Sequence, residues 1–120
     1  MTAQRTRTGL TPLTYQILLA LSAGERHGYA ILKEMEDRGG AEAVPSTGAL
    51  YMAISRLEDE GLVEAARAPA EEADSRRRYY RITRNGRAVA AAESQRLADL
   101  LADARARHLL PGAVTEGAEP

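Results

Sequence analysis

Apolar side chains recur every three or four residues in three stretches of the first half of the chain, the spacing of one helix face. The first stretch follows Thr11 and Pro12, which suit a helix start because threonine caps the backbone and proline fits the first helical position. The second begins near His27, and the third follows Ser46 and ends before Gly61. The pattern therefore predicts three short helices.

Beyond Gly61 the helical spacing of apolar residues ends, and residues 78–82 alternate with a period of two. Residues 62–65 and 78–82 read as short strands, and the polar segment between them is too long for a tight turn. Two short strands around such a loop form a β-wing. The alternation in the second strand predicts two inward side chains, Tyr80 and Ile82, and two outward ones, Tyr79 and Arg81.

A long last helix is predicted after the capping residue Thr83, from Arg84 to about Leu110. About 27 residues at 1.5 Å each span about 40 Å, more than a compact core needs. The helix therefore either folds back on its own domain or, as we expect, buries its apolar stripe against a second copy. The first helix is expected to add to this surface. The expected dimerisation residues of both helices are Leu13, Ile17, Val89, Leu97, Leu100, Leu101 and Ala104.

Three helices followed by two strands predict a winged helix-turn-helix, a mainly α fold with a small β-wing. A chain of 120 residues is long enough for one such domain and an appended element. The expected divisions are a flexible arm (1–9), a winged helix-turn-helix DNA-binding domain (10–83), a C-terminal dimerisation helix (84–110) and a disordered tail (111–120).

Composition narrows the function. The net charge is −1, so any DNA binding must rest on a local basic patch. The absence of cysteine excludes disulfides and cysteine-ligated zinc and agrees with a cytoplasmic location. No apolar run approaches the roughly 20 residues that cross a bilayer, and Met1–Thr8 lacks the apolar segment of a signal peptide, so no membrane role is expected.

Several short segments match a known family in order and spacing between about Leu10 and Arg87. They are His27–Ile31, Ser46–Tyr51, Arg56–Glu58, Glu60–Val63, and Arg76–Thr83 with Gly86-Arg87. With these segments the chain resembles the PadR family of winged-helix transcriptional regulators. The resemblance implies a bacterial repressor that binds double-stranded DNA as a homodimer, and two-fold symmetry implies a pseudo-palindromic operator.

Two departures from the family pattern bear on the wing and on effectors. Ser75 stands where family members commonly have glycine, so the wing turn is expected to differ. Members that bind flat aromatic drugs use a tryptophan of the last helix, and this chain has none. A small-molecule effector at the dimer centre remains an open alternative. The residues that would line its site fit ordinary core packing equally well: Tyr15, Leu18, Leu97 and Leu101.

The third helix is the one expected in the major groove. Its apolar stripe must face the other helices, and hydroxyl groups near its N-terminus suit phosphate contacts. For Tyr51 the alternatives are a DNA contact and packing over the turn. The expected DNA-binding residues of this helix are Ser46, Thr47, Gly48, Tyr51, Met52 and Ser55.

A basic run without any acid extends from Arg76 to Arg87. Its first three residues, Arg76, Arg77 and Arg78, are expected to meet the DNA backbone or minor groove. The alternative is that they pair with the neighbouring Glu71, Glu72 and Asp74. Other basic residues have two alternatives each. Arg56 either contacts a phosphate or forms an ion pair with a neighbouring acidic residue. Arg5 and Arg7 either reach DNA as an arm or belong to an ordinary disordered basic end.

Catalysis finds little support in the sequence. The two histidines, His27 and His108, lie far apart, and His27 at a helix start is expected to be a cap or surface residue. No phosphate-binding loop and no metal-ligand spacing is present, so no cofactor, metal or catalytic residue is predicted. The leading hypothesis is a sequence-specific DNA-binding regulator; the alternative is a winged-helix protein-interaction module that does not bind DNA.

Overall fold

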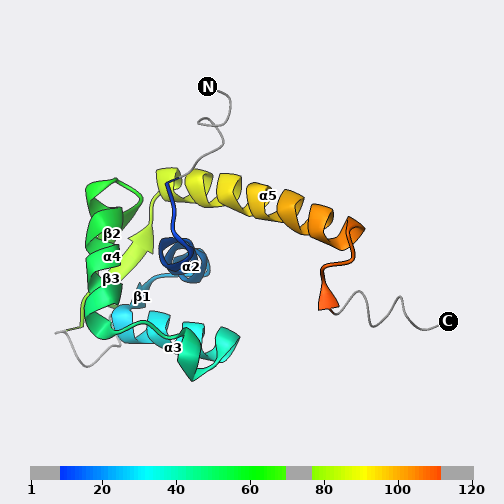
Figure 1. Cartoon of the computed structure of the whole chain (residues 1–120). Helices are drawn as coiled ribbons and strands as arrows, with labels where there is room; N and C mark the ends of the chain where they lie inside the picture. Colours follow the sequence, from blue (N-terminus) through cyan, green and yellow to red (C-terminus); the bar gives the residue numbers. More distant parts are fainter. Residues whose placement is uncertain (1–8, 70–76, 112–120) are drawn as a thin grey trace.

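The computed structural model describes residues 9–69 and 77–111, and these ranges form a helical domain with a small sheet and one projecting helix (Figure 1). The predictions for Arg5, Arg7, the acidic residues of 71–74, Ser75, Arg76 and residues 112–120 lie outside the described residues. The elements are α2 (Pro12–Leu21), β1 (Arg26–His27), α3 (Gly28–Gly39), the 3-10 helix η1 (Ala41–Ala43), α4 (Thr47–Asp59), β2 (Val63–Ala66), β3 (Tyr79–Ile82) and α5 (Arg84–Ala106). The predicted fold class, mainly α with a β-wing, is confirmed.

Side-chain caps start the helices where the sequence predicts. The Thr11 and Ser46 hydroxyls accept hydrogen bonds from the backbone N–H of Thr14 and Ala49, at 3.1 Å in both cases. Thr83 accepts from the N–H of Gly86 at 2.9 Å. Each cap satisfies a backbone donor that the first helical turn leaves without a partner, worth about 1 kcal/mol.

Strand β3 is the centre of a three-stranded antiparallel sheet with the order β1-β3-β2. Pairing with β2 joins Val63 to Ile82 and Ala66 to Tyr79, one residue later along β2 than the sequence indicated. Strand β1 was not predicted. Its two residues are too few to show a period, and only pairing with β3 defines them as a strand.

The central position of β3 corrects the prediction that Tyr79 faces outward. Tyr79 is 8% exposed, because the ring of His27, its pairing partner in β1, packs edge-on against it with centroids 5.2 Å apart. Both faces of the sheet are therefore covered at this point. The other three orientations are confirmed: Tyr80 and Ile82 pack on the core and Arg81 is exposed.

The core lies between α2, α3, α4 and the sheet. Its fully buried large side chains are Ile17, Leu18, Leu21, Ile31, Met35, Leu50, Ile54 and Leu57. Burial of each contributes about 1.5–3 kcal/mol relative to exposure. Two predictions are thereby wrong: Ile17 cannot reach a second copy and Leu18 cannot line an effector site, because neither has exposed area.

Helix α5 divides into a packed first half and a projecting second half (Figure 1). In the first half Val89 and Ala90 pack on the core. In the second half Leu100 and Leu101 are 53% and 51% exposed, so the described part of the helix does not fold back on its domain. The helix ends at Ala106, four residues before the predicted Leu110. Within the described ranges, no helix combines the length and apolarity that a membrane span requires.

Candidate nucleic-acid interface

Helix α4 turns one face to the core and the opposite face to solvent. Leu50, Ile54 and Leu57 are buried, as the predicted stripe requires. The residues predicted to face outward are all exposed, and Met52 is the most exposed large apolar side chain of the helix at 76%. The exposed set is Ser46, Thr47, Gly48, Tyr51, Met52 and Ser55.

A cavity of about 340 Å³ opens where the start of α3, the side of α4 and the chain leading into β3 meet. Among the described residues that line it, none carries a carboxylate. We call it the basic notch; its lining residues are His27, Gly28, Tyr29, Tyr51, Arg77 and Arg78. Guanidinium, imidazole and phenol groups all donate hydrogen bonds, so the basic notch suits an anion.

The position of Tyr51 shows packing, one of the two roles that the sequence left open. Its side chain packs, but against the start of α3: a methyl group at Gly28 would overlap the phenol oxygen and the adjoining ring carbon of Tyr51. The residue is nevertheless 41% exposed. Gly28 therefore permits the close approach of the two helices that holds Tyr51 at the edge of the basic notch.

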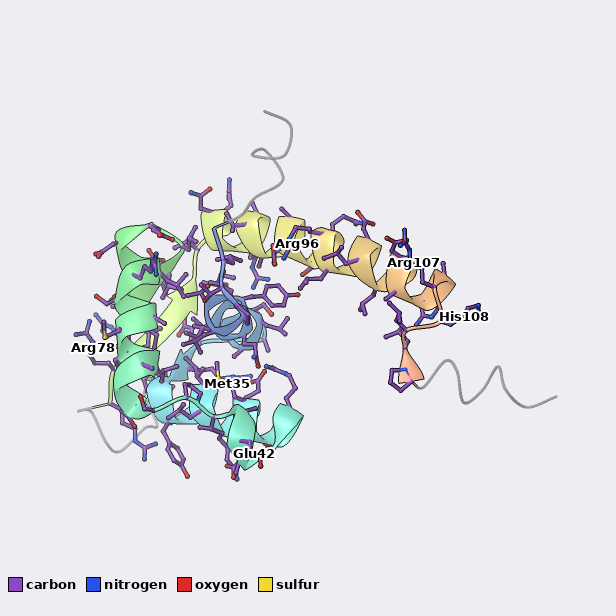
Figure 2. All side chains as sticks on the ribbon, viewed as in Figure 1. Met35, Glu42, Arg78, Arg96, Arg107 and His108 are labelled. Carbon is purple, nitrogen blue, oxygen red and sulfur yellow. The ribbon has the colours of Figure 1, made fainter. Side chains whose placement is uncertain are left out.

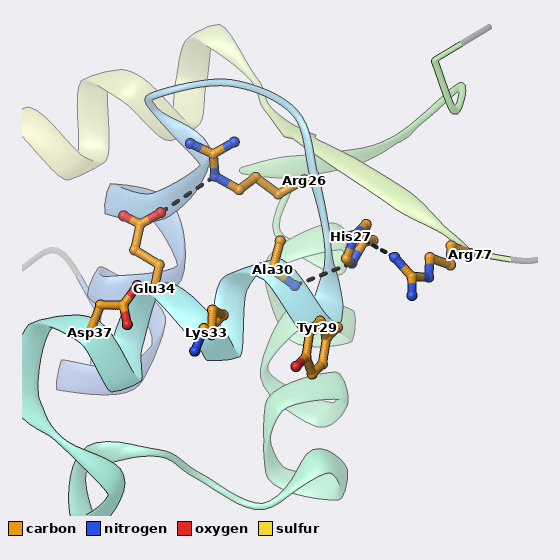
Figure 3. Close-up of a pocket in the computed structure, with 8 residues that line it drawn as sticks. All are labelled: Arg26, His27, Tyr29, Ala30, Lys33, Glu34, Asp37 and Arg77. Carbon is orange, nitrogen blue, oxygen red and sulfur yellow. Dashed lines mark hydrogen bonds and ion pairs between the residues drawn. The ribbon is translucent and has the colours of Figure 1, made fainter. Parts of the chain in front are cut away.

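His27 caps α3 with one ring nitrogen and faces the basic notch with the other. Its Nδ1 accepts the hydrogen bond of the Ala30 backbone N–H at 3.2 Å, which confirms the predicted cap. Its Nε2 lies 3.0 Å from Nη1 of Arg77 (Figure 3), so the imidazole and the guanidinium are hydrogen-bond partners at the edge of the basic notch. The guanidinium has further N–H groups from which an anionic oxygen at the basic notch would accept.

A second cavity, of about 480 Å³, adjoins the basic notch along α3 and differs in charge (Figure 3). It shares His27, Tyr29 and Arg77 with the notch but also contains the carboxylates of Glu34 and Asp37. Glu34 pairs with Arg26 at 3.4 Å and with Arg38 at 2.7 Å. This mixed charge makes the second cavity a poorer anion site than the notch.

The arginines near the sheet fall into two groups. Arg78 is exposed, lies beside α4 (Figure 2) and has its guanidinium carbon 5.7 Å from the centre of the Tyr80 ring. Burial raises the pKa of the Tyr80 phenol, and the cation of Arg78 opposes this shift. Arg81, by contrast, bonds Glu64 at 2.7 Å and Glu25 at 3.3 Å, and these hydrogen bonds raise its pKa. Arg81 is therefore occupied within the domain.

Arg56 is also engaged within the domain. Its Nε lies 3.7 Å from a carboxylate oxygen of Glu60, one turn further along α4. This distance supports the ion pair that the sequence offered as one alternative.

On α5, away from this surface, a hydrogen bond from Arg96 to the buried Glu93 raises the pKa of Arg96.

Sequence reasoning missed two residues of the basic notch. The sequence indicates His27 as a cap or surface residue and gives Tyr29 no role, whereas Tyr29 is 64% exposed with its ring 6.3 Å from that of His27 in a stacked arrangement. In the sequence, the segment His27–Ile31 stands out mainly through the family resemblance. The approach of His27 to Arg77, 50 residues away, has no local signal in the sequence.

Comparisons with known proteins agree with this architecture. The family profile described as "Transcriptional regulator PadR-like family" matches residues 17–92. A PadR family transcription regulator from hypervirulent Clostridium difficile R20291 superposes with a TM-score of 0.70 at 21% identity, covering 79% of this chain and 96% of that chain. The hsRosR-S4 complex gives 0.62 at 32% identity, with 94% and 92% covered. A transcriptional regulator from Clostridium thermocellum gives 0.60 at 27%, with 76% and 86% covered. None of the curated proteins matches the chain.

Proposed function

Because the chain belongs to the PadR-like family of transcriptional regulators, we propose that it is a sequence-specific DNA-binding repressor that acts as a homodimer. The observation that carries the proposal is the exposed N-terminal face of α4 beside the basic notch. A helix of this kind fits the major groove, and hydrogen-bond donors beside it fit the backbone that borders the groove. The two features form one continuous surface through Tyr51, which belongs to both.

In the proposed complex each part of this surface has a separate task. The face of α4 lies against base edges, the basic notch binds a phosphate next to the groove, and Arg77 and Arg78 extend the contact toward the wing. Phosphate contacts fix the register of α4 and supply most of the affinity, while base contacts supply specificity. Arg76, which lies outside the described residues, is proposed to contact DNA as well.

The proposed dimer forms through the second half of α5. Leu100 and Leu101 are half exposed there, and Leu97 and Ala104 lie on the same stripe. Stable dimers cover about 800 Å² per partner, and apolar burial yields roughly 25 cal/mol per Å². Leu13 and Val89 are partly buried against their own core and contribute only their remaining surface. Two-fold symmetry then makes the operator pseudo-palindromic, and its occupation blocks the polymerase.

Relief by a small-molecule effector is part of the proposal. A groove of about 620 Å³ runs along the second half of α5 and includes Leu100 together with the charged side chains of Arg96 and Asp99. A polar ligand bound there would lie directly beside the proposed dimer surface. Its binding could therefore change how the two protomers are held together.

The first test is fluorescence anisotropy of the purified protein on labelled duplex from upstream of its own gene. Unlabelled random duplex serves as competitor, and the titration is run at two salt concentrations. We expect binding that survives the competitor and weakens with salt. Binding that the competitor abolishes would favour the alternative, a winged helix that serves a protein partner.

A charge-matched pair of variants locates the DNA surface. Replacing Arg77 and Arg78 by alanine should weaken operator binding at least tenfold. Replacing Arg105 and Arg107, at the far end of α5 (Figure 2), removes the same charge and should change binding by less than threefold. Equal effects of the two double variants would contradict the placement of the interface.

A further inference from the structure

The outward face of α4 lacks the side chains that usually read bases in the major groove. Arginine and lysine read guanine with paired hydrogen bonds, and asparagine and glutamine read adenine. From Ser46 to Ser55 the chain contains none of these four residue types. The first charged residue of the helix is Arg56, which is paired with Glu60 at 3.7 Å.

The groups that this face does offer are small or apolar. Met52 is 76% exposed, and no other large apolar side chain of the described residues is more exposed. Gly48, one turn before it, has open space on its outer side: a methyl group built there meets no atom within 4 Å. Gly48 therefore serves no packing within its own chain, and the space beside Met52 is free for another molecule.

One chemical group in the major groove matches such a surface. Each thymine presents a C5-methyl group there, and apolar side chains recognise it by contact. Methionine suits this contact because its unbranched thioether adapts to an irregular apolar surface. The hydroxyl groups of Thr47 and Ser55 at the edges of the face accept or donate and so discriminate little between bases.

We infer that the chain reads its operator through thymine methyl groups, with Met52 as the specificity-determining residue of α4. The inference rests on the proposed function and adds the chemical class of base that is recognised. Each half-site then carries A·T pairs where Met52 enters the groove. The basic notch holds the backbone while Met52 contacts the base, so affinity and base preference reside in different residues.

The test uses duplexes in which deoxyuridine replaces thymidine, because uracil pairs as thymine does but lacks the methyl group. The preferred duplex is first selected from a random library with the full chain, and each thymine of a half-site is then replaced singly. We expect one or two replacements per half-site to weaken binding about fourfold, as expected for one buried methyl group. Replacements in the spacer should have no effect.

The variant Met52→Ala assigns the effect to the residue. Because Met52 is exposed, the variant should keep the thermal stability of the parent chain, and it should bind the thymine and uracil duplexes equally. Specific binding that is insensitive to every uracil replacement would overturn the inference and leave the proposed function standing. Retained sensitivity in Met52→Ala would overturn the role of Met52. Failure to select any duplex would instead contradict the proposed function itself.

Discussion

At the scale of single residues, His27 couples folding to the proposed DNA contact. One ring nitrogen holds the first turn of α3 and the other faces Arg77, so the same side chain contributes to stability and to the basic notch. Such a double role makes an alanine substitution hard to interpret. A residue that caps as well as histidine but is shorter would separate the two contributions.

The variant His27→Asn provides this separation. Asparagine is among the best N-cap residues, so the unfolding temperature should stay close to that of the parent chain. DNA affinity should fall three- to tenfold because Arg77 loses the side chain that positions it, and the slope of log K against log salt should stay the same because no lysine or arginine is removed. Thermal unfolding and anisotropy over a salt series measure both. Unchanged DNA affinity would contradict a role of His27 at the basic notch.

Two glycines in first turns of helices should respond to alanine in opposite directions. Gly28→Ala places a methyl group against the Tyr51 phenol and should destabilise the fold by about 1–3 kcal/mol. Gly48→Ala meets open space and should leave stability unchanged or raise it by up to about 1 kcal/mol. Urea unfolding of both variants measures the two changes in the free energy of unfolding. If Tyr51 is responsible, Tyr51→Ala should remove most of the penalty of Gly28→Ala.

At the scale of elements, local signals were sufficient where a helix carries its own caps. Thr11, Ser46 and Thr83 start their helices where the sequence places them, because a cap depends on residues only three positions apart. Strand β1 and the burial of Tyr79 could not be predicted, since both depend on pairing between residues about 50 positions apart.

The candidate site divides in the same way. The exposed face of α4 follows from helical period alone, whereas the basic notch exists only because three separate segments converge on His27. Sequence periodicity also placed Ile17 on the dimer surface, although the neighbouring helices bury it completely. A period shows which residues share a face but not what covers that face.

The two faces of α5 should differ in their response to an introduced charge. Leu101→Asp puts a carboxylate on the apolar stripe and should weaken the dimer at least tenfold, with a matching loss of operator affinity. Ala102→Asp adds the same charge to another side of the helix and should leave assembly unchanged. Sedimentation over a range of protein concentrations gives both dissociation constants. A Leu101→Asp protein that assembles normally would contradict the role of this stripe.

At the scale of the whole molecule, the proposed dimer determines how the α4 face of one protomer is positioned relative to that of its partner. The proposed α4 face lies at one end of the domain, and α5 projects away from it toward the other (Figure 1). In a two-fold dimer the two α4 helices would sit one turn of DNA apart, about 34–36 Å. Operator spacing then becomes a property of the assembly and not of any single residue.

Operator spacing can be tested directly on the selected duplex. Inserting five base pairs between the half-sites turns one of them to the opposite face of the DNA, so binding should fall to the affinity of an isolated half-site. Changing the spacer sequence without changing its length serves as the control and should have a small effect. Anisotropy on the three duplexes makes the comparison, and tolerance of the insertion would argue against a rigid dimer.

The junction before α5 determines how firmly this helix is attached to its domain. Thr83 donates to the Gly61 carbonyl at 2.7 Å and caps α5 through Gly86, whose missing side chain leaves room for the Leu62 carbonyl. These contacts hold the first half of α5 on the domain, so the projecting second half, Gln95–Ala106, is a lever about 18 Å long. A tilt of about 10° where this half leaves the domain displaces the far end by about 3 Å, nearly one base-pair step. A small ligand that tilts the lever could thus release an operator without touching the DNA surface.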